Sequence, residues 1–140
     1  AETGRGATVN GEPIRVSATR EIDEALVATG FPYDRDQYAE EYGRSVVAVL
    51  AQARGLRRIG SAALDLTWVA CGRFDAYWEY SLGPWDAAAG ALIATEAGAI
   101  VTDGRGAPYT LDSRHVVAAN PHLHPQLRAI IEPVIPDHVG

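Results

Sequence analysis

Short apolar segments alternate with longer segments of helical periodicity from residue 25 onward, and this alternation constrains the fold more than any other feature of the sequence. The apolar segments predict short strands at residues 25–28, 56–59, 75–80, 100–102 and 116–119. The periodic segments predict helices at residues 36–54, 61–71, 85–98 and 121–132. This order of elements favours a layered α/β sandwich, in which helices flank a mixed, largely parallel sheet.

The first twenty residues predict a separate β-hairpin. Asn10-Gly11 is a strong two-residue turn signal because both residues accept positive φ angles, and it lies between strand-like segments at 6–9 and 14–16. The chain is therefore expected to comprise a hairpin region at 1–20, an α/β domain at 21–134 and a short tail at 135–140.

Charge and composition narrow the classes of partner. The chain of 140 residues has a net charge of −6, which argues against direct binding of duplex nucleic acid, because phosphate contacts need clustered Lys and Arg. No apolar run approaches the ~20 residues needed to cross a bilayer, so we expect no association with a membrane. A single cysteine, Cys71, excludes an internal disulfide and fits a reducing compartment, so we expect a cytoplasmic protein.

Two carboxylates stand where open α/β sheets collect their ligands. Glu79 is near the end of the predicted strand 75–80, and Asp86 opens the predicted helix 85–98 across a tight turn. Ligands of such sheets gather at the carboxyl ends of strands and near helix N-termini. Oxygen donors beside a helix N-terminus suit Mg²⁺ together with a phosphate group. The spacing by itself leaves a simpler interpretation open, in which Asp86 caps the helix and Glu79 is solvated.

A second helix start follows the predicted strand 56–59. Gly60, Ser61 and Ala62 are small residues, which let a ligand approach the free N–H groups of the helix. The alternative is that Ser61 is an ordinary N-cap. Glu96, near the end of a later helix, is interpreted as structural or exposed.

Several segments, in the same order, resemble the inositol monophosphatase family. WDAAAGALIATEAG, at residues 85–98, resembles the family's C-terminal signature, roughly W-D-x-A-A-G-x-x-I-x-x-E-A-G-G. GSAALDL at 60–66 and ATGFPY at 28–33 are similar to two further segments of the family. The residues from Gly4 to Ser17 resemble its hairpin, G-x-G-A-x-x-N-G-x-x-I-x-V-S.

The resemblance implies a site and an activity. It implies that Asp86 is a catalytic residue that binds Mg²⁺ and approaches the substrate, and that Glu79 hydrogen-bonds a hydroxyl of the inositol ring. The residues that it places in the substrate pocket beside them are Gly60, Ser61 and Ala62. The implied reaction is Mg²⁺-dependent hydrolysis of a small phosphorylated substrate, foremost inositol 1-phosphate, in a lithium-sensitive homodimer.

The resemblance covers only part of the family's pattern. In the family, the first half carries a metal-binding Glu and the motif D-P-x-D-G-T, whereas no Asp-Pro dipeptide occurs here. We therefore expect the chain to correspond to the C-terminal half, with its hairpin belonging to a sheet of the first half, and to be inactive alone. Sister activities are alternatives: fructose bisphosphatase, histidinol phosphatase or nucleotide 3′-phosphatase. A non-catalytic protein-binding module is the alternative from another class.

Overall fold

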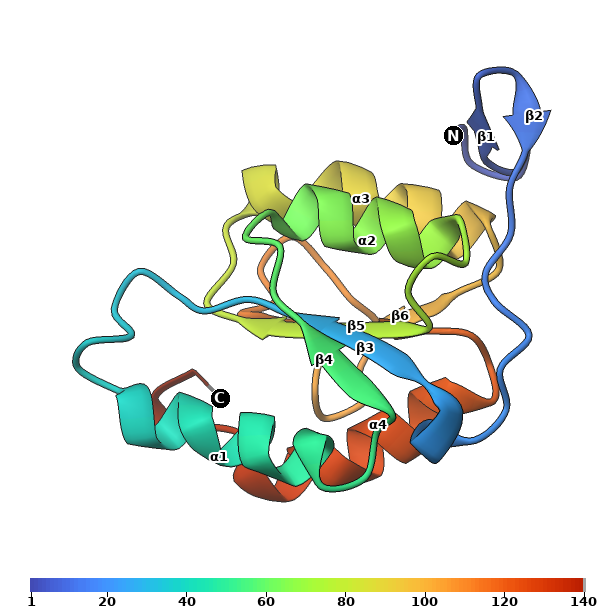
Figure 1. The fold of residues 1–140 in the computed structure, drawn as a ribbon. Helices are drawn as coiled ribbons and strands as arrows, with labels where there is room; N and C mark the ends of the chain where they lie inside the picture. The colour runs from blue at the N-terminus through green and yellow to red at the C-terminus, as the bar shows by residue number, and fades with distance from the viewer. Residues whose placement is uncertain (140) are drawn as a thin grey trace.

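The computed structural model describes residues 1–139 and has the expected architecture, a sheet between two layers of helices (Figure 1). The strands of the sheet are β3 (Leu26–Thr29), β4 (Gly55–Arg57), β5 (Ala76–Tyr80), β6 (Ile100–Thr102) and β7 (His115–Ala119). The helices are α1 (Ala39–Leu50), α2 (Ala62–Ala70), α3 (Pro84–Glu96) and α4 (Leu123–Ile131). Single 3₁₀ turns are η1 (Ile22–Glu24), η2 (Glu132–Val134) and η3 (Asp137–Val139). Within residues 1–139, no helix combines the length and apolar character that a membrane crossing requires.

The sheet is mixed, with the strand order β4-β3-β5-β7-β6. β3 pairs in parallel with β4 and β5, whereas β7 pairs antiparallel with β5 and β6. The antiparallel half follows from the loop at 103–114, which joins β6 to β7 without a helix, because parallel neighbours need a crossover connection. The parallel half comprises β4, β3 and β5, so the carboxyl ends of these three strands lie at one edge of the sheet.

Strand β5 runs through the centre of the core. All five of its residues are buried, and alternate side chains point to opposite faces of the sheet. Trp78 and Tyr80 pack in the cluster that α1 and α4 cover, whereas Tyr77 packs beneath α2 and α3. Glu79 shares the face of Tyr77, so a carboxylate stands inside the α2–α3 side of the protein.

Helices α2 and α3 pack unusually close together, and both begin at the same end of the sandwich (Figure 1). A Cβ atom placed on Gly90 of α3 would lie 2.7 Å from Cβ of Leu66 in α2. The α3 residues Ala87, Ala91 and Ala94 are also buried. The small residues of this helix therefore permit the close approach, and the two N-termini share one edge of the molecule.

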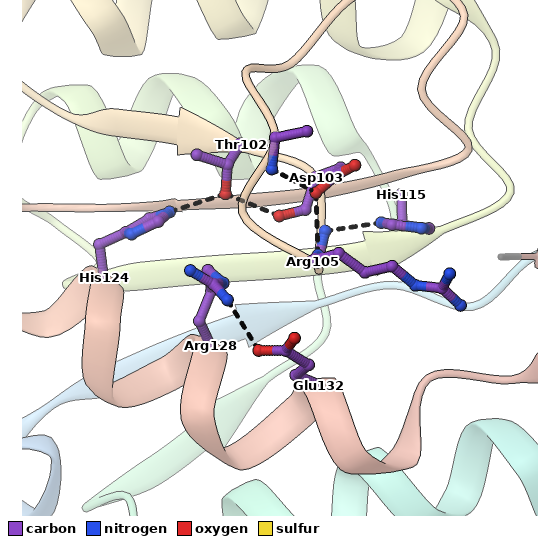
Figure 2. A network of polar contacts seen from close by, with 9 residues as sticks. Thr102, Asp103, Arg105, His115, His124, Arg128 and Glu132 are labelled. Atoms are coloured by element: carbon purple, nitrogen blue, oxygen red, sulfur yellow. Dashed lines mark hydrogen bonds and ion pairs between the residues drawn. The ribbon is translucent and has the colours of Figure 1, made fainter.

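A polar network fastens the loop at 103–114 to α4 (Figure 2). The Thr102 hydroxyl donates to the carbonyl oxygen of Asp103 at 2.6 Å and lies 2.9 Å from Nε2 of His124. Because a hydroxyl has one hydrogen, His124 donates to Thr102 from Nε2. Burial and then the charge of Arg128 lower the pKa of His124 to about 4, so the imidazole is neutral. Its hydrogen bond to Thr102 ties the start of the loop to α4.

The N-terminal hairpin projects away from the sandwich (Figure 1). β1 (Thr8–Val9) pairs antiparallel with β2 (Glu12–Pro13), and both strands are exposed. The sequence predicts the second strand at 14–16, whereas β2 begins two residues earlier, at Glu12. Residues 14–16 instead pass the end of α3, where Val16 N–H donates to the carbonyl oxygen of Ala97 at 3.1 Å. Ile14 N–H still donates to the carbonyl oxygen of Ala7 at 3.0 Å, next to the β1–β2 ladder, and Ile14 and Val16 both pack against a cluster of alanines.

Candidate functional site

A pocket of about 370 Å³ lies at the carboxyl ends of the parallel strands, where α2 and α3 begin. The site residues predicted from the sequence all line this pocket: Gly60, Ser61, Ala62, Glu79 and Asp86. They come from the end of β4, the start of α2, strand β5 and the first turn of α3. The structure therefore brings together five residues that are spread over 27 positions of the sequence, from 60 to 86.

Asp86 occupies the first turn of α3 and reaches back to the residue that precedes the helix. Its Oδ2 accepts a hydrogen bond from Gly83 N–H at 3.0 Å, and Asp86 N–H donates to the carbonyl oxygen of Gly83 at 3.0 Å. Capping and ligand binding do not exclude each other here. Within residues 1–139, Oδ1 of Asp86 makes no hydrogen bond to the protein, so one carboxylate oxygen is left for a ligand.

Glu79 is buried, with 8% of its surface exposed, so the interpretation of a solvated side chain is wrong. Tyr77 donates its hydroxyl hydrogen to Oε2 of Glu79. Gly30, at the end of β3, provides the space: a Cβ atom there would lie 2.2 Å from both carboxylate oxygens. Burial raises the pKa of Glu79 and the charge of Asp86 raises it further, whereas Tyr77 and Arg58 oppose the shift.

The start of α2 combines an N-cap with an open face. Ser61 precedes the helix with extended backbone angles, and its hydroxyl accepts from Leu64 N–H at 3.4 Å, so the N-cap interpretation holds. Ala62 and Ala63, the first residues of the helix, also line the pocket. Unsatisfied N–H groups and the positive end of the helix dipole therefore border the same space as the two carboxylates.

Asp65 is a second buried carboxylate that the sequence analysis did not single out. None of its surface is exposed, and neither carboxylate oxygen has a hydrogen-bond partner within residues 1–139. Burial, followed by the charge of Glu79, raises the pKa of Asp65 to about 7, against an opposing effect of Arg58. A signal was present in the sequence: Asp65 follows Ser61 by four residues, which places both on one face of a helix.

Two arginines also border the pocket and were missed. Arg58 follows β4, and Arg35 lies in the loop after β3. Only the folded chain places these cations beside Glu79 and Asp86, because the four residues belong to different elements.

The family model described as the inositol monophosphatase family matches residues 1–135. The chain belongs to the inositol monophosphatase family. A Nus factor SuhB of Pseudomonas aeruginosa is 42% identical over 138 residues, which are 97% of this chain and 51% of the relative. An inositol-1-monophosphatase of Synechocystis is 43% identical over 127 residues, 91% of this chain and 44% of the relative.

Solved structures of the family have the same fold. The extragenic suppressor protein SuhB from Bartonella henselae matches with a TM-score of 0.89 at 39% identity, covering 94% of this chain and 50% of that one. An inositol monophosphatase from Anabaena matches with a TM-score of 0.89 at 39% identity, covering 98% and 54%. The chain thus spans about half the length of the relatives that it matches.

The donors present in this member of the family fit only part of a metal site. Within residues 1–139, no group of three or more His, Cys, Asp or Glu side chains is arranged to hold a metal ion. Asp86 supplies a carboxylate oxygen of the type that Mg²⁺ prefers, but Mg²⁺ takes six ligands in octahedral geometry. The residues therefore fit one corner of such a site and need further donors to complete it.

Proposed function

We propose that the chain forms one wall of the active site of a Mg²⁺-dependent phosphatase, which hydrolyses a small phosphate monoester, foremost inositol 1-phosphate. The observation that supports this most is the single pocket, in a member of this family, that gathers Glu79, Asp86 and the start of α2. Acidic oxygens beside free helix N–H groups suit a metal ion and a phosphate in one place.

In this proposal each group that lines the pocket has a distinct role. Asp86 would hold Mg²⁺ with the carboxylate oxygen that does not cap α3, where the ion would supply stabilisation of charge on the phosphoryl group. The N–H groups of Ala62 and Ala63 attract anionic or hydroxyl oxygens of the substrate. Glu79, held in place by Tyr77, hydrogen-bonds a ring hydroxyl and orients the substrate. The remaining metal ligands and the group that positions the water belong to the family's first half.

The test is hydrolysis of inositol 1-phosphate with Mg²⁺ by a protein that contains both halves of the family's site. Asp86→Asn is expected to lower kcat/KM by about a hundredfold or more, because a metal ligand loses its charge. Glu79→Gln is expected to shift the preference among phosphate esters more than the rate. Asp23→Asn, an exposed substitution in η1, is the matched control and should change neither. Unchanged turnover in Asp86→Asn would defeat the metal assignment.

Sister activities are tested on the same protein. Fructose bisphosphate, histidinol phosphate and nucleotide 3′-phosphates are offered as competing substrates, and the highest kcat/KM identifies the substrate class. Lithium inhibition, a homodimer and a cytoplasmic location are further proposals that rest on the family. Direct binding of nucleic acid is not proposed, because the net charge is −6.

A protein-binding role is the second candidate, because several of the relatives carry the name Nus factor. Such a role needs the surface of the fold and not the chemistry of Asp86. Binding to a protein partner that survives Asp86→Asn, in a protein without phosphatase activity, would favour this candidate over the enzyme.

A further inference from the structure

The walls of the pocket carry opposite charges on opposite sides of β3. The sheet order is β4-β3-β5, so Arg58 follows the outer strand, whereas Glu79 belongs to the inner strand. Asp86 adds a second negative charge on the inner side, and Arg35 adds a second positive charge in the loop after β3. A ligand that fills the pocket therefore meets both guanidinium groups and carboxylates.

Arg58 has a defined position on its side of the pocket. Its guanidinium carbon lies 5.8 Å from the centre of the Phe31 ring, as in a cation–π contact. Gly60 lies beside it with a φ angle of 93°, and a Cβ atom there would make only an ordinary van der Waals contact with a guanidinium nitrogen, at 3.5 Å. Stacking uses the flat face of a guanidinium and leaves the N–H groups at its edge free to donate.

Neither arginine of the pocket forms an ion pair with a carboxylate within residues 1–139, although the charge of Arg58 opposes the rise in the pKa of Glu79 and of Asp65. The ion pairs formed by residues 1–139 are Arg5–Glu2, Arg128–Glu132 and His138–Glu41, none of them in this pocket. Arg35 donates to the carbonyl oxygen of Pro32 at 3.3 Å, which uses one of its five N–H groups. Two guanidinium groups at one pocket are thus available to an anion. A guanidinium group binds a carboxylate or phosphate through two parallel N–H···O hydrogen bonds.

We propose that Arg58 and Arg35 form a second anion subsite, and that the pocket prefers a phosphate ester that carries a second anionic group. The proposal rests on the proposed function in one respect, since it assigns the ester phosphate to the Asp86 side. The second group is recognised by its negative charge and paired oxygens, which a phosphate and a carboxylate share.

The experiment measures binding to the 140-residue chain, by chemical-shift titration of the ¹⁵N-labelled protein with excess Mg²⁺ present. One pair of probes is inositol 1-phosphate and inositol 1,4-bisphosphate, which differ by one phosphate. A second pair is glycerol 3-phosphate and 3-phosphoglycerate, which differ by one carboxylate. We expect the second anion to tighten binding about tenfold in at least one pair, because hydrogen bonds between charged groups are the strong ones.

Variants assign the gain to its residues. Arg58→Gln should abolish the tenfold gain, so that the two members of a probe pair bind with equal affinity, whereas Arg58→Lys should keep part of the gain. Arg57→Gln is the matched control: Arg57 is the exposed neighbour of Arg58 and does not line the pocket. Superimposable spectra of the unbound variants establish that they fold alike.

Three results would overturn the subsite: equal affinity within both probe pairs, including no detectable binding; an equal loss for both members of a pair in Arg58→Gln; or the same loss in Arg57→Gln. Hydrolysis plays no part in this measurement. If the protein fails the phosphatase test and still prefers the doubly charged probe, the subsite stands and the proposed function does not. If it hydrolyses esters without this preference, only the proposed function stands.

Discussion

At the scale of single residues, Asp65 has the most unfavourable surroundings for a charge. It is fully buried and has no hydrogen-bond partner within residues 1–139, and its pKa is raised from 3.8 to about 7. The unfolded chain therefore releases this proton near pH 4, and the folded chain near pH 7. Stability is highest below pH 4 for this group, falls as the pH rises between these values, and has lost its full contribution above pH 7.

Asp65→Asn is expected to remove this pH dependence. Between pH 5 and pH 8 the free energy of unfolding of the unsubstituted chain should fall on the order of 2 kcal/mol further than that of the variant, since one pKa unit equals about 1.4 kcal/mol. Urea unfolding of both proteins at the two pH values checks this, and all other titrating groups are common to both. Parallel pH profiles would mean that Asp65 is ionised without cost or is hydrated.

Glu96 illustrates a residue whose partners are far away in the sequence. Its two carboxylate oxygens accept from Gly4 N–H and Gly6 N–H, each at 2.8 Å, and these bonds lower the pKa of Glu96. Glu96→Gln should weaken both bonds, because an amide oxygen accepts less strongly and its NH₂ group cannot accept. Faster hydrogen exchange at Gly4 and Gly6, with unchanged exchange in β5, is the expected result. Equal protection in both proteins would show that the loop is held by other contacts.

At the scale of elements, the contact between α2 and α3 decides whether Gly90 tolerates a side chain. Alanine is the better helix former, but a Cβ atom at Gly90 would meet three atoms of Leu66, the closest at 2.7 Å. Gly90→Ala should therefore destabilise the protein by about 1–3 kcal/mol through overpacking.

Gly43→Ala is the matched control for this prediction. Gly43 lies inside α1, and a Cβ atom there would meet no atom within 4 Å. Alanine at this position should stabilise by up to about 1 kcal/mol through its helix propensity. Urea unfolding separates the two effects, and a stabilising Gly90→Ala would mean that the helices move apart at little cost.

The elements themselves were largely readable from the sequence, whereas their ends were not. The predicted helix 36–54 forms only over α1 (Ala39–Leu50), and the predicted strand 56–59 begins one residue earlier and ends at Arg57. Periodicity identifies the buried face of an element but carries little information about where the hydrogen bonds stop. The ends of the predicted strand and helix singled out Glu79 and Asp86, and the resemblance gave them their roles, because both signals are local in the sequence. Arg58 and Asp65 escaped notice because their significance lies in contacts between different elements.

At the scale of the whole molecule, the pocket lies at a single edge of the sandwich. The carboxyl ends of β4, β3 and β5 and the starts of α2 and α3 form it, and it opens away from the sheet. Phe31 and Trp85 are among the residues at this pocket, and Trp85 is 85% exposed. An exposed indole ring beside the pocket offers an apolar face and an N–H donor to a ligand or to another segment of protein.

The 140-residue chain alone should not hydrolyse inositol 1-phosphate. Asp86 offers one free carboxylate oxygen, and within residues 1–139 no cluster of acidic or imidazole side chains completes a metal site. A single carboxylate does not fix Mg²⁺ in octahedral geometry, and the proposed function takes the group that positions the attacking water from the family's first half.

The measurement compares phosphate release by the chain alone, by a first half taken from a relative of known structure, and by the two mixed with Mg²⁺. Turnover only in the mixture, lost again with Asp86→Asn, is the expected result, because the second half then contributes a ligand and a pocket wall and the first half contributes the rest. Substantial turnover by the chain alone, abolished by Asp86→Asn, would mean that one carboxylate and the helix N-termini suffice. The pocket would then work by a chemistry different from the one proposed for the family's two-part site.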